Sequence, residues 1–284
     1  MAEFQIISPF NTVLPLIDND YFHLIEVDSQ TGFNASISSN KSSGYDGANV
    51  NSLSTDPRAI VITLQIKQSV DVEEAKRYIF SYIKPKQKHT IIWNRNKREL
   101  SIEGYCENAT MPRWENGVKC QITFFCEQPY WEDIDAVIQE ISDVIPLHYF
   151  TVQEDDMLYF DADGIVMGEY DLARTRNYYN SGDVSVGVEI VINALKTVTN
   201  PVIYSAVDKY IGADITLAAG EKIIITTHKG NKDITKDGVS IIDKLRQGSS
   251  WLQLETGENT FTINSDEEAT DNMYFEIIYS QRYV

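Results

Sequence analysis

Cysteine is scarce in this sequence: the 284 residues contain only Cys106, Cys120 and Cys126. An odd number of cysteines without an export signal argues against a disulfide framework. Cys120 and Cys126 both occupy the apolar positions of an alternating segment, so we interpret them as small buried hydrophobic side chains. The alternative is a zinc or redox site, but the cysteine spacing is unlike that of zinc ligands.

Long apolar runs are also missing. No segment approaches the ~18 apolar residues that a membrane helix needs. The first ten residues include Glu3 and lack both the basic start and the apolar stretch of a signal peptide. We therefore expect a protein that is made in the cytoplasm and has no membrane partner.

Basic residues are outnumbered, because 24 Lys and Arg stand against 42 Asp and Glu, which gives a formal charge of −18. Residues 1–140 carry 13 basic and 19 acidic side chains, a balance of −6, and residues 141–284 carry 11 and 23, a balance of −12. Both halves repel a phosphate backbone, so we expect no nucleic-acid partner.

The residue patterns of catalysis and metal binding are absent as well. No HExxH or similar spacing connects the four histidines, and no GxSxG elbow or glycine-rich phosphate loop occurs. The densest acidic cluster, at residues 154–163, lacks EF-hand spacing and is better explained by a hairpin turn at Asp163-Gly164. We predict no enzymatic activity, no cofactor and no essential metal. The histidines are His23, His89, His148 and His228.

Alternating apolar residues are plentiful, and they predict a β protein. With 43% hydrophobic and 11% aromatic residues the chain can fill packed cores, and its length favours two domains of about 150 residues. The period-two pattern of half-buried strands occurs at residues 21–27, 60–66, 89–93, 100–106 and 118–126.

The strand at 118–126 is followed by Pro129, Tyr130 and Trp131, where proline ends the ladder and an aromatic pair follows. We interpret this exit as a buried joint at the end of the first domain. A short helical linker is predicted over residues 133–146. The domains are therefore predicted to cover residues 1–140 and 141–284.

One amphipathic helix is predicted in the first domain. Asp71 is suited to cap it, and an apolar stripe runs through Val72, Ala75, Ile79 and Tyr82. Pro85 ends the helix, which places Lys84 in the last turn, where the helix dipole favours a cation.

Between the first two strands lies a polar tract, residues 34–57, rich in Ser, Asn, Gly and Asp. A structureless loop of that length is uncommon inside a compact domain. We interpret it as a protruding loop or hairpin that becomes ordered against a neighbouring molecule, with a mobile surface loop as the alternative.

The second half has short alternating runs separated by turn signals, for example at 182–183, 219–220, 228–231, 237–238 and 256–257. Strands that recur every 8–12 residues between such turns are typical of a β-sandwich.

Several segments, taken in order, are similar to those of a known family. They are residues 56–64, from Asp-Pro-Arg, residues 122–133, which end in Pro-Tyr-Trp-Glu-Asp, residues 220–227, the Asp-Gly turn at 237–238, and residues 250–261, from Ser-Trp-Leu. Together they resemble the distal tail protein family of siphophages and the related components of prophages and phage-tail-like bacteriocins.

The resemblance implies a mostly β fold: an N-terminal domain like the tail-tube fold, with one flanking helix, and a C-terminal galectin-like sandwich. It also implies a structural role, in which six copies form a ring at the distal end of the tail tube. The expected partners are other copies of the chain, the tube protein, a hub or spike, and receptor-binding or other baseplate proteins, at the tail tip of the virion.

Two other functions stay open from the sequence. The sandwich with Trp251 leaves a carbohydrate-binding tail-tip protein as the runner-up, and a wall hydrolase comes third because we locate no catalytic carboxylate pair. As interface candidates we select the aromatic pair at the domain joint, a basic turn, and one residue each from the first and last family segments. These residues are Arg58, Arg95, Lys97, Arg98, Tyr130, Trp131 and Trp251.

Overall fold

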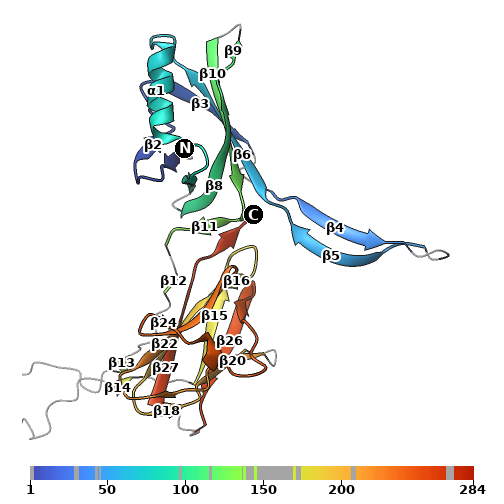
Figure 1. Cartoon of the computed structure of the whole chain (residues 1–284), viewed down its shortest axis with the longest axis vertical. Coiled ribbons are helices and arrows are strands. Elements are labelled where there is room, and N and C mark those ends of the chain that lie inside the picture. The colour runs from blue at the N-terminus through green and yellow to red at the C-terminus, as the bar shows by residue number, and fades with distance from the viewer. Residues whose placement is uncertain are drawn as a thin grey trace, which may run out of the picture. The chain divides into compact units, whose positions relative to one another are not determined.

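The computed structural model describes residues 3–28, 32–41, 44, 46–95, 98–114, 117–135, 137–138, 144–145, 169–170, 174–205, 209–266 and 272–284. The chain divides into two compact units. Unit 1 contains Met1–Asp135 together with Arg282–Val284, and unit 2 contains Ala136–Gln281. The mostly β fold predicted from the sequence is confirmed (Figure 1).

Unit 1 is built on one antiparallel sheet in the order β2-β1-β7-β8-β10-β6-β3, to which β9, β11 and β28 add short pairings. Its strands are β1 (Glu3–Ile7), β2 (Val13–Pro15), β3 (Phe22–Asp28), β6 (Arg58–Ile66), β7 (Lys88–Arg95), β8 (Arg98–Thr110), β9 (Arg113–Trp114), β10 (Gly117–Cys126), β11 (Trp131–Asp133) and β28 (Arg282–Tyr283).

An extensive antiparallel pairing in this sheet joins β10 to β6. Cys120 lies opposite Leu64, Ile122 opposite Ile62 and Phe124 opposite Ile60, so the predicted apolar positions of both strands share one buried face. Cys120 and Cys126 are buried free thiols, and burial raises the pKa of each to about 12. Their role as small core side chains agrees with the sequence prediction.

Helix α1 (Val72–Tyr82) packs Ala75 and Ile79 into the core of unit 1. Asp71 caps it as predicted, because its carboxylate accepts hydrogen bonds from the amides of Glu73 and Glu74. Lys84 lies beyond the helix, contrary to the prediction, because Ile83 already has extended backbone. Its ammonium still donates to the carbonyl of Phe80 at 3.0 Å and so satisfies a C-terminal carbonyl.

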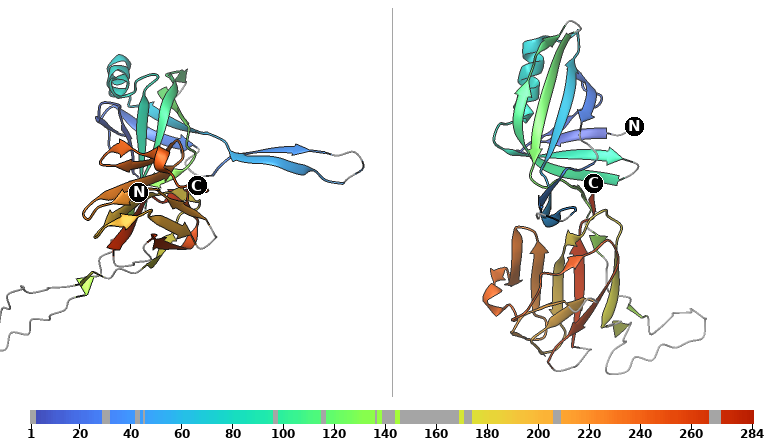
Figure 2. Two further views of the ribbon diagram at one scale, coloured as in Figure 1. Left: turned by 60° about the horizontal axis from the view of Figure 1, so that its bottom comes forward. Right: turned by 90° about the vertical axis from the view of Figure 1, so that its right-hand side faces the viewer.

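The polar tract forms a hairpin, as one of the two sequence interpretations expected. Strands β4 (Ala35–Asn40) and β5 (Asn49–Thr55) pair with each other in a sheet of two. Figure 1 and the left panel of Figure 2 show this ribbon, called the arm below, reaching away from the sheet of unit 1.

Residues 133–146 do not form the predicted helix where they are described. They contain β12 (Val137–Ile138), which pairs with β27 (Met273–Tyr279), and β13 (Val144–Ile145), which pairs with β14 (Glu169–Tyr170). The pairs Val137-Ile138 and Val144-Ile145 are β-branched, which favours extended backbone over helix.

Unit 2 contains two antiparallel sheets that enclose an apolar core, as the sandwich prediction requires. One has the order β12-β27-β17-β22-β23-β24, with β17 (Glu189–Ala194), β22 (Lys222–His228), β23 (Asn231–Lys236), β24 (Val239–Ser240) and β27 (Met273–Tyr279). The other has the order β15-β26-β19-β20, with β15 (Thr175–Asn180), β19 (Val202–Ser205), β20 (Tyr210–Gly212) and β26 (Gly257–Asn264). Shorter elements are β16 (Val186–Gly187), β18 (Val198–Thr199), β21 (Thr216–Leu217), β25 (Gln253–Leu254) and the 3₁₀ turn η1 (Ile242–Lys244).

The last residues of the chain belong to unit 1, whereas the sequence boundaries placed them in the second domain. The backbone of β28 pairs with β11, so that Tyr283 lies opposite Trp131 and Arg282 opposite Glu132. A two-residue strand gives too short a pattern to be assigned from sequence.

Trp131 is the largest fully buried side chain of unit 1 and lies against Trp93, with ring centroids 5.4 Å apart. We predict that Trp131→Ala lowers the free energy of unfolding of unit 1 by roughly 3–5 kcal/mol, as for large-to-small changes in a core. Guanidinium denaturation measures this loss. Trp251→Ala is the matched control and should cost less, because Trp251 is only half-buried. Equal losses would contradict the prediction.

His89 is buried in unit 1, where its ring centroid lies 5.5 Å from that of Phe124 in β10. The amide of Lys84 donates to its Nε2 at 3.0 Å, so the ring proton is on Nδ1, 2.9 Å from the carbonyl oxygen of Gln87. Burial lowers the pKa of His89 below its ordinary value.

This lowered pKa predicts a pH dependence. The unfolded state takes up a proton near pH 6.5 while the folded state resists it, so the stability due to neutral His89 is present above that pH and falls as pH is lowered through the folded pKa. We expect the stability difference between the native chain and His89→Gln to shrink from pH 7.5 to pH 5.0 in urea melts. A constant difference would show that His89 does not titrate in this way.

Candidate interaction surfaces

The arm has two chemically different faces. Residues directly opposite in an antiparallel pair lie on the same face, and successive residues alternate. Ile37 lies opposite Leu53, which places both on one face, and Ser38 opposite Ser52 on the other.

A β-bulge extends the apolar face. The register shifts after Ser38, so that Ser39 lies opposite Val50 and Asn51 has no paired residue. Ser39 is on the face of Ile37, and therefore Val50 joins Ile37 and Leu53 there. These three side chains are 56%, 62% and 71% exposed, in the order Val50, Ile37, Leu53. This stripe is not apparent from the sequence, because without the bulge Val50 would fall on the serine face.

The arm joins unit 1 through a set of polar contacts at its root. The amide of Asp56 donates to the carbonyl of Asn34 at 2.8 Å, and the hydroxyl of Ser36 donates to the Asp56 carboxylate at 2.7 Å. The hydroxyls of Thr55 and Tyr130 are 2.9 Å apart. Tyr130, an interface candidate from the sequence, thus holds the arm to the exit from β10.

Arg58 is buried beside this root, with 6% of its surface exposed. Its Nη2 donates to the carbonyl of Gly32, and its Nη1 has no hydrogen-bond partner among the described residues. Burial lowers the pKa of its guanidinium, while the neighbouring Cys126 and Tyr130 oppose that shift. The side chain lines a cavity of about 370 Å³, called the arm-root cavity below. Its walls are Gly32, Phe33, Asn34, Asp56, Pro57, Arg58, Ala59 and Pro129.

Arg98 is the first residue of β8, which pairs with β11, and β11 in turn pairs with β28. Its guanidinium carbon is 5.2 Å from the centre of the Tyr283 ring. The Tyr283 hydroxyl is 3.1 Å from the Asp133 carboxylate, and Arg282 forms an ion pair with Glu132 at 2.6 Å. Arg98 was predicted from the sequence to contact a partner. The structure instead gives its side chain a contact within unit 1.

The two remaining basic candidates from the sequence are Arg95 and Lys97. Arg95 ends β7 and pairs in register with Arg98, and Lys97 lies outside the described residues. The acidic cluster at 154–163 and the Asp163-Gly164 turn also lie outside the described residues.

Trp251 is half-buried against the core of unit 2, and the ammonium of Lys232 lies 5.8 Å from its ring centre. This contact occupies one face of the indole, so the ring is a poor stacking platform for a sugar. The lectin-like alternative gains no support from Trp251.

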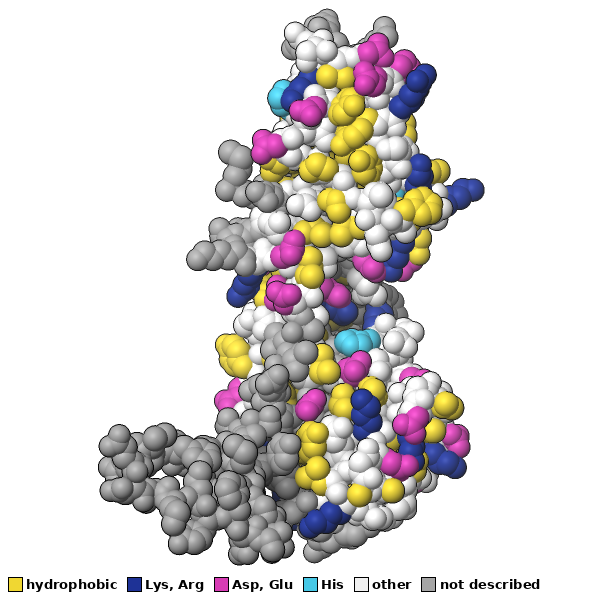
Figure 3. All heavy atoms as spheres, turned by 90° about the vertical axis from the view of Figure 1, so that its left-hand side faces the viewer, with side chains coloured by type: hydrophobic (Ala, Val, Ile, Leu, Met, Phe, Trp, Pro, Cys, Tyr) yellow, Lys and Arg dark blue, Asp and Glu magenta, His cyan; other side chains and the backbone are white. Residues whose placement is uncertain are grey.

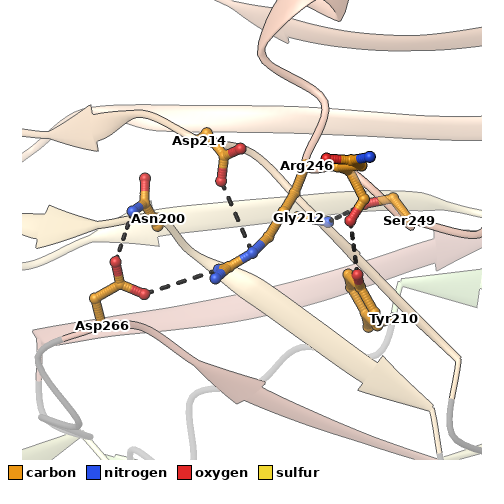
Figure 4. A network of polar contacts seen from close by, with 8 residues as sticks. Asn200, Tyr210, Gly212, Asp214, Arg246, Ser249 and Asp266 are labelled. Atoms are coloured by element: carbon orange, nitrogen blue, oxygen red, sulfur yellow. Dashed lines mark hydrogen bonds and ion pairs between the residues drawn. The ribbon is translucent and has the colours of Figure 1, made fainter.

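Polar residues of unit 2 gather instead around Arg246 (Figure 4). Its guanidinium lies 3.8 Å from each of the Asp214 and Asp266 carboxylates, and the amide of Asn200 donates to Asp266 at 2.6 Å. The neighbouring Tyr210 hydroxyl donates to the carbonyl of Gln247 at 2.7 Å. These contacts fasten the 244–250 segment to β20, which is a structural role.

No group of three or more potential metal ligands comes together within the described part of the chain. None of the described helices has the length and apolar character to cross a membrane. On the face seen in Figure 3, acidic and basic side chains are intermixed with hydrophobic ones over the coloured residues of both units.

Comparison with known families supplies the identification. The model of the phage tail protein RIFT-related domain matches residues 17–126, and the model of the siphovirus-type tail component, C-terminal domain, matches residues 181–283. The first match lies in unit 1, and the second lies in unit 2 except for its last two residues, in the order that the sequence resemblance implied. The chain belongs to the phage distal tail protein family. The two matches confirm the family resemblance seen in the sequence. The protein is therefore a structural component of a phage tail.

The fold of this distal tail protein is shared by a solved structure. The crystal structure of Dit from phage SPP1, titled a paradigm of the hub adsorption apparatus in phages that infect Gram-positive bacteria, has a TM-score of 0.69 at 13% identity and covers 99% of both chains. A chain of the phage P2 baseplate in its activated conformation with Ca has a TM-score of 0.48 at 11% identity and covers 99% of this chain and 98% of that one. A search among curated proteins finds no relative that matches.

The contact of Arg98 with Tyr283 is measurable. In a double-mutant cycle of Arg98→Ala and Tyr283→Leu, we expect a coupling free energy of about 0.5–1 kcal/mol, the size of a cation–π contact at an exposed site. The same cycle with the exposed Arg77 of helix α1 should give a coupling near zero. A coupling free energy near zero for Arg98 as well would contradict this contact and would leave the Arg98 side chain free to bind a partner, as predicted from the sequence.

Proposed function

We propose that this distal tail protein forms a hexameric ring at the distal end of the tail tube and links the tube to the hub or spike and the baseplate. Membership of the distal tail family and the fold shared with SPP1 Dit over almost the whole chain support this role. In this proposal unit 1 forms the ring, other copies and neighbouring tail proteins are its partners, and the chain carries no enzymatic activity.

The observation that carries the ring proposal is the apolar face of the arm. Ile37, Val50 and Leu53 lie side by side on a two-stranded ribbon and are mostly exposed. An isolated two-stranded hairpin is at best marginally stable in water, and an exposed apolar stripe indicates a docking site. A closed ring needs two different surfaces on each copy, one of which meets the other on the next copy. The arm supplies one of these two surfaces.

The test replaces the apolar side chains while leaving the hairpin backbone intact. Ile37→Thr, Val50→Thr and Leu53→Thr together keep strand propensity and remove apolar area. We expect this variant to shift from rings to monomers in mass photometry and negative-stain images, with unit 1 still folded by circular dichroism. The control is Ser38→Thr with Ser52→Thr, which changes only the serine face and should leave rings in place.

Two outcomes separate the parts of the proposal. If the triple variant assembles into rings at the same protein concentration as the native chain, the arm is not part of the ring interface. The proposal that the chain forms a ring would remain. A native chain that stays monomeric at micromolar concentration, alone and with tube protein, would overturn the ring.

A further inference from the structure

Unit 1 has a groove of about 580 Å³ beside β3, the strand that ends its sheet. It is called the β3 groove below. Part of its lining consists of buried core side chains, which are Phe4, Leu16, Phe22 and Val27. Three further apolar lining residues keep accessible surface: Ile17 and Leu24 are half-buried, and Ile25 is 45% exposed. The groove therefore presents branched aliphatic side chains to whatever enters it.

Ile25 occupies a β-bulge in this wall. In the pairing of β3 with β6, Leu24 lies opposite Leu64 and Glu26 opposite Thr63, so Ile25 is the extra residue. A bulge also interrupts the edge of a sheet and disfavours the addition of another strand. The β3 groove is therefore suited to receive side chains rather than to extend the sheet.

The arm of another copy has side chains that match this groove. Its apolar stripe, Ile37, Val50 and Leu53, is also branched and aliphatic, and it is more than half exposed. The groove volume lies in the range of pockets that hold whole small-molecule ligands, so several aliphatic side chains fit. Among the described residues that line the groove, none belongs to the arm or its root, in contrast to the arm-root cavity. The arm of the same copy therefore does not fill it.

Charge favours the arm over other surfaces of a second copy. The polar lining includes Asp18 and Glu26 against Lys67, so the groove has a small negative balance. Since the chain has a formal charge of −18, most of its surface is repelled there at short range. Residues 35–55 contain one lysine, Lys41, and one acidic residue, Asp46, so the arm is neutral. It approaches the groove without that repulsion.

We propose that the β3 groove is the second surface of the ring interface and receives the apolar stripe of the arm from the next copy. This inference rests on the proposed ring, for which it names the acceptor of the arm. Each copy then offers its arm to one neighbour and its groove to the other, which is the heterologous contact that closes a ring.

A first experiment is a double-mutant cycle on assembly, measured by mass photometry over a dilution series. Ile25→Thr and Leu53→Thr should each raise the concentration of half-assembly by about tenfold, because each removes apolar area from the same contact. The double variant should fall clearly below the roughly hundredfold product that independent sites give. Ile134→Thr is the control, since Ile134 is 42% exposed and does not line the groove, and it should assemble as the native chain does. Circular dichroism checks that each variant is folded.

A second experiment identifies what occupies the groove. The photo-crosslinking residue p-benzoylphenylalanine replaces Ile25 in one variant and Leu53 in another. Rings are assembled from isotope-labelled and unlabelled chains, so that mass spectrometry separates crosslinks between copies from those within one. We expect the probe at position 25 to react with residues 35–55 of another copy, and the probe at position 53 with residues 16–27. A probe in place of Ser52, on the serine face of the arm, should react much less with residues 16–27.

The outcomes distinguish this inference from the ring on which it rests. Rings in which the position 25 probe reacts only within its own copy, or with a segment other than the arm, would overturn the groove as acceptor and leave the ring intact. So would a double variant that reaches the full product of the two single effects, or an equal effect of Ile134→Thr. Absence of rings from the native chain would overturn both proposals.

Discussion

Unit 1 depends on the pairing of β10 with β6. Their register places Ile122 opposite Ile62 and Phe124 opposite Ile60, and this apolar face is what helix α1 covers. β6 begins at Arg58, three residues after the end of the arm at Thr55, and β11 begins at Trp131, five residues after the end of β10. Both the arm root and the anchoring of β28 are therefore fixed by this pair of strands. A one-residue slip of the register would turn the whole apolar set to the opposite face.

The sequence was sufficient where a periodic pattern is long. Strands β6, β7, β8 and β10 and helix α1 could be predicted from alternation or from the stripe after Asp71, because each buries one face of a regular element. Short strands could not: Arg282–Tyr283 and Val137–Ile138 each have two residues, and their pairing with β11 and β27 is decided by long-range contacts. A helix was predicted over residues 133–146 because the local sequence pattern contains no information about these long-range strand pairings.

The candidate site shows a similar division. The polar tract could be identified as an extension from its composition, but its apolar face depends on a bulge at Asn51 that changes which side Val50 occupies. Arg58 was selected as part of a family segment, while its burial and its incomplete hydrogen bonds are properties of the folded chain. The charge of the Arg95–Arg98 turn predicted a docking role, and the packing of Arg98 on Tyr283 gives it an internal one.

The return of residues 282–284 to unit 1 affects how the two units are able to move. Unit 2 is connected through the chain at two places, between residues 135 and 136 and between residues 281 and 282. In the β11–β28 pair, Glu132 and Arg282 are the partners nearest to these two connections, and their ion pair ties them together. Two connections whose unit 1 ends are paired leave unit 2 fewer rotational degrees of freedom than a single covalent connection would.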